Sequence, residues 1–173
     1  MRDGRGGIVA VIVLAGCPQL FAESGKAVIQ GTAEGSKVSG TAALEDTSEG
    51  LKVAVRVANV SPGKHGLHIH EFGSCRDSGN SAGGHYNPDQ VKHGFLPTDG
   101  LGGAHTGDLG NIEVGADGTG TLELTIKDVR LSSGKYAVGG RAIVLHEKAD
   151  DFGQPTGNAG SRIGCGPIVI TGK

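Results

Sequence analysis

Seven histidines are the residues of this sequence whose type and spacing most clearly indicate chemistry. His68 and His70 are separated by one residue, so in a β-strand both imidazoles lie on one face, with Leu67 and Ile69 on the other. A lone strand histidine is more often structural than a metal ligand, but two side by side form half of a chelating site. His65 falls on the face opposite His68, and we interpret it as a structural hydrogen-bonding residue.

Further candidate ligands follow in a long segment rich in glycine and other turn-forming residues. His85, His93 and His105 lie in this segment, and Asp108 follows His105 at a spacing that suits a short-range chelating pair. His146 ends an apolar, strand-like run. So many metal-binding side chains in otherwise turn-forming loops favour a functional metal centre over chance.

A β-rich scaffold must position these side chains. Leu51, Val53, Val55 and Val57 alternate with more polar or smaller residues, which predicts a strand with one buried face. Similar runs, separated by turn signals, occur near residues 27–33, 37–44, 121–127, 141–146 and 167–171. Because 33 of the 173 residues are glycine without a collagen-like period, we expect many tight turns. The sequence therefore predicts an all-β sandwich or barrel.

Two segments break the strand rhythm, residues 71–110 and residues 148–164. Loops of this length in a compact domain are usually functional or disordered, so we expect a metal or a disulfide to hold them. The chain is long enough for one domain with a substantial core. Its net charge of −2 gives no basic footprint for nucleic acid, and any attraction for an anionic substrate would have to be local.

The N-terminal segment is typical of an export signal. Arg2 and Arg5 precede an apolar stretch too short to cross a membrane as a helix. The residues before Cys17 resemble a bacterial lipobox, which predicts a lipoprotein-type signal peptide over residues 1–16, a lipidated Cys17 and a tether over 17–25. An ordinary secretory peptide cleaved elsewhere is the alternative. Residues 26–173 form the predicted domain, in which Cys75 and Cys165 suit one disulfide of an exported protein.

Several motifs, in the same order along the chain, resemble the signatures of the copper/zinc superoxide dismutases. The resemblance covers nearly all of residues 26–171. The motifs are Gly66–Gly73, Ser81–Pro88, His105–Asn111, Gly140–Arg141, His146–Asp151 and Gly157–Arg162.

The resemblance implies a Greek-key β-sandwich or barrel of about eight antiparallel strands, with a long metal-binding loop and a shorter active-site loop. It implies one copper and one zinc per subunit, joined through the imidazole of His85. The copper ligands would be His68, His70, His85 and His146, and the zinc ligands His85, His93, His105 and Asp108. Four imidazoles suit Cu(II), and three histidines with one aspartate suit a closed tetrahedral zinc site.

The resemblance also implies roles for residues around the metals. Asp150 would link the rings of His68 and His93, a surface carboxylate being the alternative. Arg162 would attract and orient the anion as a catalytic residue with His85, and Thr156 would narrow the substrate channel opposite Arg162.

Two departures from the eukaryotic pattern bear on the branch of the family. Cys75 and Cys165 match the family's disulfide, but Cys75 stands only five residues after His70. The charged segment before Thr156 is much shorter than in eukaryotic members. Both features resemble the bacterial, exported branch.

The implied function is dismutation of superoxide to oxygen and hydrogen peroxide, as antioxidant defence outside the cytoplasm. A periplasmic copper-binding or chaperone-like protein without turnover is the alternative, although such relatives usually lack a ligand. We expect a periplasmic or cell-envelope location, membrane attachment only through a lipid at Cys17, and no nucleic-acid partner. A homodimer through the surface around Phe72–Gly73, Gly139–Gly140 and Ile170 is compatible with the resemblance.

Overall fold

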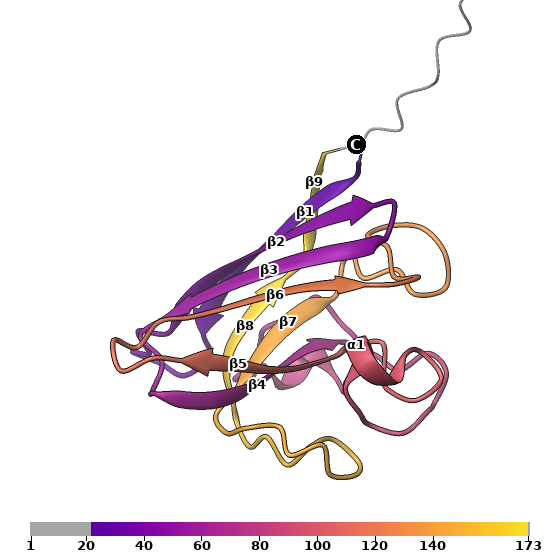
Figure 1. Ribbon diagram of the computed structural model, residues 1–173. Helices are drawn as coiled ribbons and strands as arrows, with labels where there is room; N and C mark the ends of the chain where they lie inside the picture. The colour runs from indigo at the N-terminus through magenta and orange to yellow at the C-terminus, as the bar shows by residue number, and fades with distance from the viewer. Residues whose placement is uncertain (1–21, 173) are drawn as a thin grey trace, which may run out of the picture.

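A computed structural model describes residues 22–172 of the chain (Figure 1). The predicted signal peptide and Cys17 lie outside the described residues. Within them are a four-residue helix α1 (Leu96–Asp99), a short 3-10 helix η1 (Asn80–Ala82) and strands of a single sheet. The strands are β1 (Ser24–Gly31), β2 (Ser39–Thr47), β3 (Gly50–Ala58), β4 (Gly63–His70), β5 (Asp108–Val114), β6 (Gly120–Ile126), β7 (Ala142–His146), β8 (Arg162–Pro167) and β9 (Val169–Gly172).

The strands form an antiparallel barrel of eight strands when β8 and β9, which are separated by one residue, are counted as one, and this confirms the predicted all-β class. The sheet order is β2-β3-β6-β5-β4-β7-β8-β1, and β2 also pairs with β1, so the sheet closes on itself. β9 follows β8 almost directly and pairs with β1 at its other end. The jumps from β3 to β6 and from β4 to β7 bring strands distant in sequence side by side (Figure 1).

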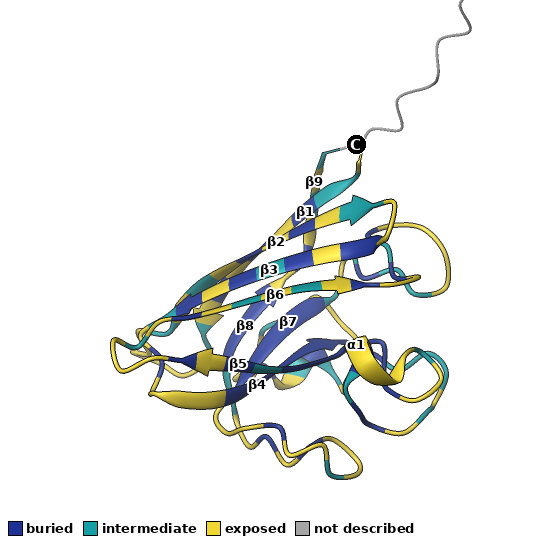
Figure 2. Ribbon diagram, viewed as in Figure 1, coloured by how far each residue is buried: buried dark blue, intermediate teal, exposed yellow. Residues whose placement is uncertain are grey.

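The barrel core consists of the aliphatic residues that the alternating pattern predicts. Leu51, Val53, Val55 and Val57 of β3 are buried, and the residues between them are exposed or half-buried. Figure 2 shows this alternation of buried and exposed positions along β2 and β3, whereas β7 is buried along its whole length. The hydrophobic effect therefore fixes which face of β2 and β3 points into the core. The ends of β4 and β7 that carry His68, His70 and His146 are instead buried on both faces.

Two predicted loops are shorter than expected, because strands begin inside them. β5 begins at Asp108, within the predicted loop 71–110, and β8 begins at Arg162, within the predicted loop 148–164. Both strands contain glycine, which has a low strand propensity and hides the alternating pattern. Pairing with neighbouring strands forms them nevertheless. Similarly, β1 begins at Ser24 and so includes the last two residues of the predicted tether.

The two remaining loops carry five of the residues predicted at the metal sites and the channel, His85, His93, His105, Asp150 and Thr156. Residues 71–107 correspond to the metal-binding loop that the resemblance implies and are named the zinc-binding loop. Residues 147–161 correspond to the implied active-site loop, keep that name, and lie beneath the barrel in Figure 1. The predicted disulfide is present: Cys75 of the zinc-binding loop is bonded to Cys165 of β8, with Cα atoms 5.7 Å apart. No helix within residues 22–172 is both long and apolar enough to cross a membrane.

Candidate metal centre

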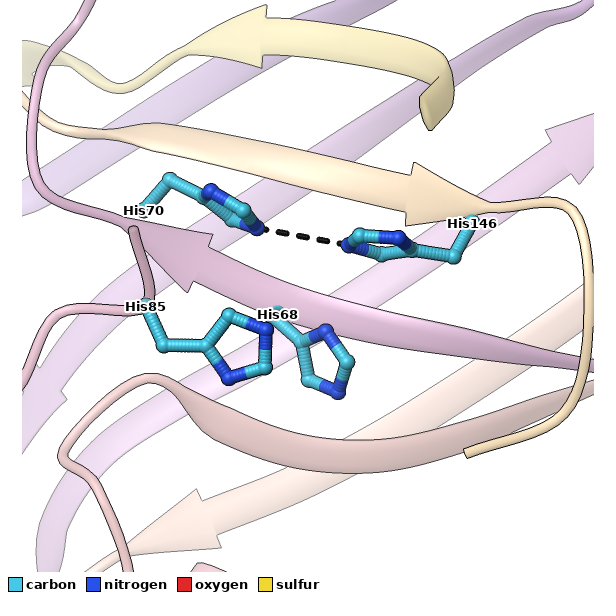
Figure 3. A group of neighbouring side chains, drawn as sticks. All are labelled: His68, His70, His85 and His146. Carbon is cyan, nitrogen blue, oxygen red and sulfur yellow. Dashed lines mark hydrogen bonds between the residues drawn. The ribbon is translucent and has the colours of Figure 1, made fainter. Parts of the chain in front are cut away.

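The first group of ligands lies where β4, β7 and the zinc-binding loop meet. His68 and His70 come from β4, His146 ends β7, and His85 reaches in from the loop. Figure 3 shows the four rings turned toward a common region, and their candidate ligand atoms all lie within 4.8 Å of one another. The Nε2 atoms of His70 and His146 lie 3.3 Å apart, and the ring centroids of His68 and His85 lie 4.0 Å apart. The pairing of β4 with β7 therefore assembles most of this site.

Hydrogen bonds on the outer side of each ring decide which nitrogen faces the metal. His70 Nδ1 lies 3.0 Å from the carbonyl oxygen of Gly83, and His146 Nδ1 lies 3.2 Å from that of Gly160. Both rings therefore present Nε2 inward. His68 is reversed, since its Nε2 is bonded to a carboxylate and its buried Nδ1 has no partner among the described residues. A metal ion is the natural partner for that buried nitrogen.

The second group consists of His85, His93, His105 and Asp108. The Nδ1 atoms of the three histidines lie 2.8, 2.9 and 3.1 Å from the carboxylate oxygens of Asp108. The Nδ1 atoms of His85 and His105 are 3.4 Å apart. Zinc bonds of about 2.0–2.1 Å in a tetrahedron imply ligand separations of about 3.3 Å. This group therefore fits a closed tetrahedral zinc site, and His85 belongs to both groups.

Burial keeps His70, His85 and His146 of the first group neutral at physiological pH. Desolvation is the main cause that lowers the pKa of His70 to about 2, of His146 to about 3 and of His85 to about 4. A neutral imidazole offers the lone pair that a metal needs. The first group thus supplies at least three buried, neutral nitrogen donors, which suits copper.

The second group instead contains a carboxylate that stays ionised. Burial alone would raise the pKa of Asp108, but hydrogen bonds with His105, His85 and His93 outweigh burial and hold that pKa well below its usual range. Burial alone would lower the pKa of His93, but its hydrogen bonds with Asp108 and Asp150 raise it to about 9. This group therefore favours positive charge, and zinc would supply it.

Asp150 connects the two groups. One carboxylate oxygen accepts a 2.8 Å hydrogen bond from His68 Nε2, and the other accepts a 2.9 Å bond from His93 Nε2. Asn111 pairs with the Asp150 backbone, accepting from its N–H at 2.7 Å and donating to its carbonyl at 2.9 Å. Gly157 packs so close that any side chain there would collide with this carboxylate. Asp150 therefore lies between the rings, as the resemblance implies.

A small cavity of about 210 Å³ opens beside the first group. Its wall includes His70, His85, His146, Thr156 and Arg162. The Arg162 guanidinium donates 2.6 Å hydrogen bonds to the carbonyl oxygens of Gly79 and Gly83, which fix its position. The structure thus brings together the two residues that the resemblance places at the channel.

His65 belongs to neither group, as its position in the strand predicts. It is buried, and its ring nitrogens lie 2.9 Å from the carbonyl oxygen of His146 and 2.8 Å from that of Ser61. The sequence predicted no role for Asn111, although this residue ends the motif His105–Asn111. No pattern in the sequence indicated a role for Gln154, which contacts His93.

Comparisons with known proteins agree with this geometry. Residues 38–168 match the family model described as copper/zinc superoxide dismutase (SODC). The extracellular superoxide dismutase (Cu-Zn) of Caenorhabditis elegans is 47% identical over 119 residues, which are 65% of this chain and 52% of that protein. The chain thus spans about half the length of this curated relative. The crystal structure of the clock protein EA4 has 35% sequence identity and a TM-score of 0.75, covering 86% of this chain and 94% of that one.

The family match includes every ligand of both groups. The first group, His68, His70, His85 and His146, is therefore the copper site, and the second is the zinc site, with His85 bridging the two. The match extends over well more than half of the sequence, and the chain belongs to the copper/zinc superoxide dismutase family.

Proposed function

We propose that this protein dismutates superoxide, converting two superoxide ions and two protons into oxygen and hydrogen peroxide. The observation that carries the proposal is the shared His85, which joins two complete ligand groups directly beneath a small cavity. Bound copper would supply the one-electron chemistry, being reduced by one superoxide and reoxidised by the next. A complete ligand set favours this function over copper storage or transfer without turnover.

Arg162 would attract and orient the anion at the cavity wall. Its guanidinium is held by two backbone carbonyls, so it is already positioned before an anion arrives. A fixed planar cation binds an oxyanion better than a mobile lysine does. Thr156 also lines the cavity, whose volume of about 210 Å³ has room for a small anion such as superoxide.

His85 would deliver a proton to the product. Its Nδ1 lies 2.8 Å from Asp108 in the zinc site, so the ring is fixed and Nε2 is the nitrogen that serves the copper site. A proton held at Nε2 lies beside the cavity, where the second superoxide would be reduced to hydrogen peroxide. We therefore assign catalytic roles to His85 and Arg162.

Reconstitution with copper and zinc, followed by a superoxide-removal assay, tests the proposal. The protein loaded with both metals should be active, and the same protein loaded with zinc alone should be inactive. His146→Ala should lower activity at least about 100-fold, because it removes a copper ligand from the cavity wall. Full activity in this variant, or inactivity of the doubly loaded protein, would contradict the proposal.

We further propose that the protein is exported, belongs to the bacterial branch and is lipid-anchored at Cys17. A disulfide between Cys75 and Cys165 is typical of oxidising compartments, and the similar nematode protein is described as extracellular. The short active-site loop and the position of Cys75 support the branch. Mass analysis of the protein from a membrane fraction should show an acylated Cys17, and Cys17→Ser should release the protein into the soluble fraction.

A homodimer is the remaining proposal. Phe72 has a relative exposure of 58%, and its neighbour Gly73 packs against Gly140, so two of the expected contact segments form one surface. Ile170 contacts Gly139 beside them. Sedimentation should give twice the monomer mass, and Phe72→Glu should give a monomer. A monomeric wild-type protein would contradict this proposal.

A further inference from the structure

The active-site loop holds the zinc ligand His93 at more than one point. Asp150 accepts a hydrogen bond from its ring Nε2, and the ring of Phe152 stacks beside it at 6.4 Å between centroids. Gln154 contacts the backbone of the same histidine. Contacts therefore come from every second residue of this loop segment, and they converge on one ligand.

Gln154 pairs with both polar groups of the His93 backbone. Its Oε1 accepts from the His93 N–H at 3.1 Å, and its Nε2 donates to the His93 carbonyl at 2.8 Å. A carboxamide offers one acceptor and one donor side by side, as a neighbouring strand does. His93 lies in a loop, outside the strands of the barrel. The Gln154 side chain therefore makes the two hydrogen bonds to the His93 backbone that a paired strand would otherwise make.

The direction of a histidine ring depends on both its backbone and its outer nitrogen. Asp150 fixes the Nε2 end of His93, but the ring could still pivot about that contact if the backbone moved. Pairing with Gln154 removes this freedom, because the backbone is then tied to the loop that carries Asp150. The Nδ1 atom is left 2.9 Å from the Asp108 carboxylate, as a zinc ligand requires.

We propose that Gln154 is a positioning residue for the zinc site, acting through the backbone of His93. The proposal rests on the assignment of zinc to His85, His93, His105 and Asp108. Gln154 is exposed, so substitution there creates no cavity in the core and should leave the barrel folded.

The experiment compares Gln154→Ala and Gln154→Glu with wild type in the protein loaded with copper and zinc. Zinc release to a chelator should be about tenfold faster in Gln154→Glu, because a carboxylate cannot donate to the His93 carbonyl and loses that bond. Gln154→Ala should accelerate zinc release by about three- to tenfold. It loses both hydrogen bonds to the His93 backbone, but unlike Gln154→Glu it does not place a carboxylate against the His93 carbonyl oxygen. Gln90→Glu is the charge control, as Gln90 is an exposed carboxamide of the zinc-binding loop.

Cobalt placed in the zinc site gives a second readout, because its visible absorption responds to ligand geometry. Gln154→Ala should change this spectrum, while the thermal unfolding of the metal-free protein stays the same. Zinc release within twofold of wild type in both variants, or an unchanged cobalt spectrum, would overturn the proposal. Failure of the wild-type protein to bind zinc would instead refute the metal assignment, so the two failures are distinguishable.

Discussion

The copper and zinc sites share His85, yet they are built on different parts of the fold. Three of the copper ligands stand on β4 and β7, and strand pairing fixes their backbone positions: His68 and His70 pair with β7, and His146 pairs with β8. The zinc site takes three histidines from the zinc-binding loop and only Asp108 from a strand. Strand pairing therefore prepares the copper site before any metal arrives, whereas side-chain contacts must prepare the zinc site.

The chemistry of the two sites differs in the same way. Burial is the main cause that lowers the pKa of His70 and His146 in the copper site. In the zinc site the ionised Asp108, together with Asp150, outweighs burial and raises the pKa of His93. The copper site is preformed by strands, whereas the zinc site is charged and built from a loop. The two sites should therefore respond differently to substitution, to pH and to salt.

The largest effect should come from removing the disulfide, which ties the zinc-binding loop to β8. The double change Cys75→Ser with Cys165→Ser opens a crosslink that spans 90 residues. We expect a loss of about 4–5 kcal/mol in the free energy of unfolding, measured with denaturant on the metal-free protein. Limited proteolysis should cut within residues 71–107 before it cuts the barrel. Equal cleavage of the barrel strands would contradict the distinction between the two sites.

Substitution of Asp150 should affect zinc more than copper. Asp150→Asn replaces one acceptor with a donor, so one of the two histidine N–H groups loses its partner. Zinc affinity should fall about 10–100-fold, and copper affinity less, because His68 is already fixed by β4. Competition with chelators of known affinity measures both values. Asp151→Asn, which changes an exposed neighbour, serves as the control.

The stability of the metal-free protein should depend on pH with opposite signs for the two sites. Below the ordinary histidine pKa of 6.5, unfolded His70 and His146 bind protons that the folded sites exclude, so stability falls as pH decreases. The pKa of His93 is raised to about 9, so its contribution is complete below pH 6.5 and is lost as pH rises through about 9.

Denaturant unfolding across pH 5–10 measures both limbs of this profile. Each limb should have a slope of up to about 1.4 kcal/mol per pH unit for each proton exchanged. His93→Gln should flatten the alkaline limb and leave the acid limb in place. An acid limb that disappears in this variant would show that the two sites do not titrate separately.

The smallest effect should be that of salt on the catalytic rate. Arg162 is the only lysine or arginine among the described residues that line the cavity. Long-range steering of superoxide therefore rests on few charges, and we expect less than about a twofold decline in rate across ordinary ionic strengths. A steep decline in a salt titration would show that more distant cations, such as Lys148 and Lys92, contribute.

Much of the site could be read from the sequence because metal chemistry restricts residue types. The spacing of His68 and His70 places both imidazoles on one strand face whatever the rest of the fold does. The short spacing of His105 and Asp108 likewise lets both side chains reach one metal without help from distant parts of the chain. The start of β5 at Asp108 was not predictable, because its strand character depends on pairing with β4 rather than on local propensity.

The sequence by itself determined the ligand types, the strand faces of the copper ligands and the cysteines of the disulfide, since each follows from side-chain chemistry or local periodicity. Only the tertiary structure decided how Asp150 reaches both rings, how Arg162 is held by Gly79 and Gly83, and that Gln154 pairs with His93. These contacts join residues 57–83 positions apart, and hydrogen bonds over such separations leave no periodic signal in the sequence.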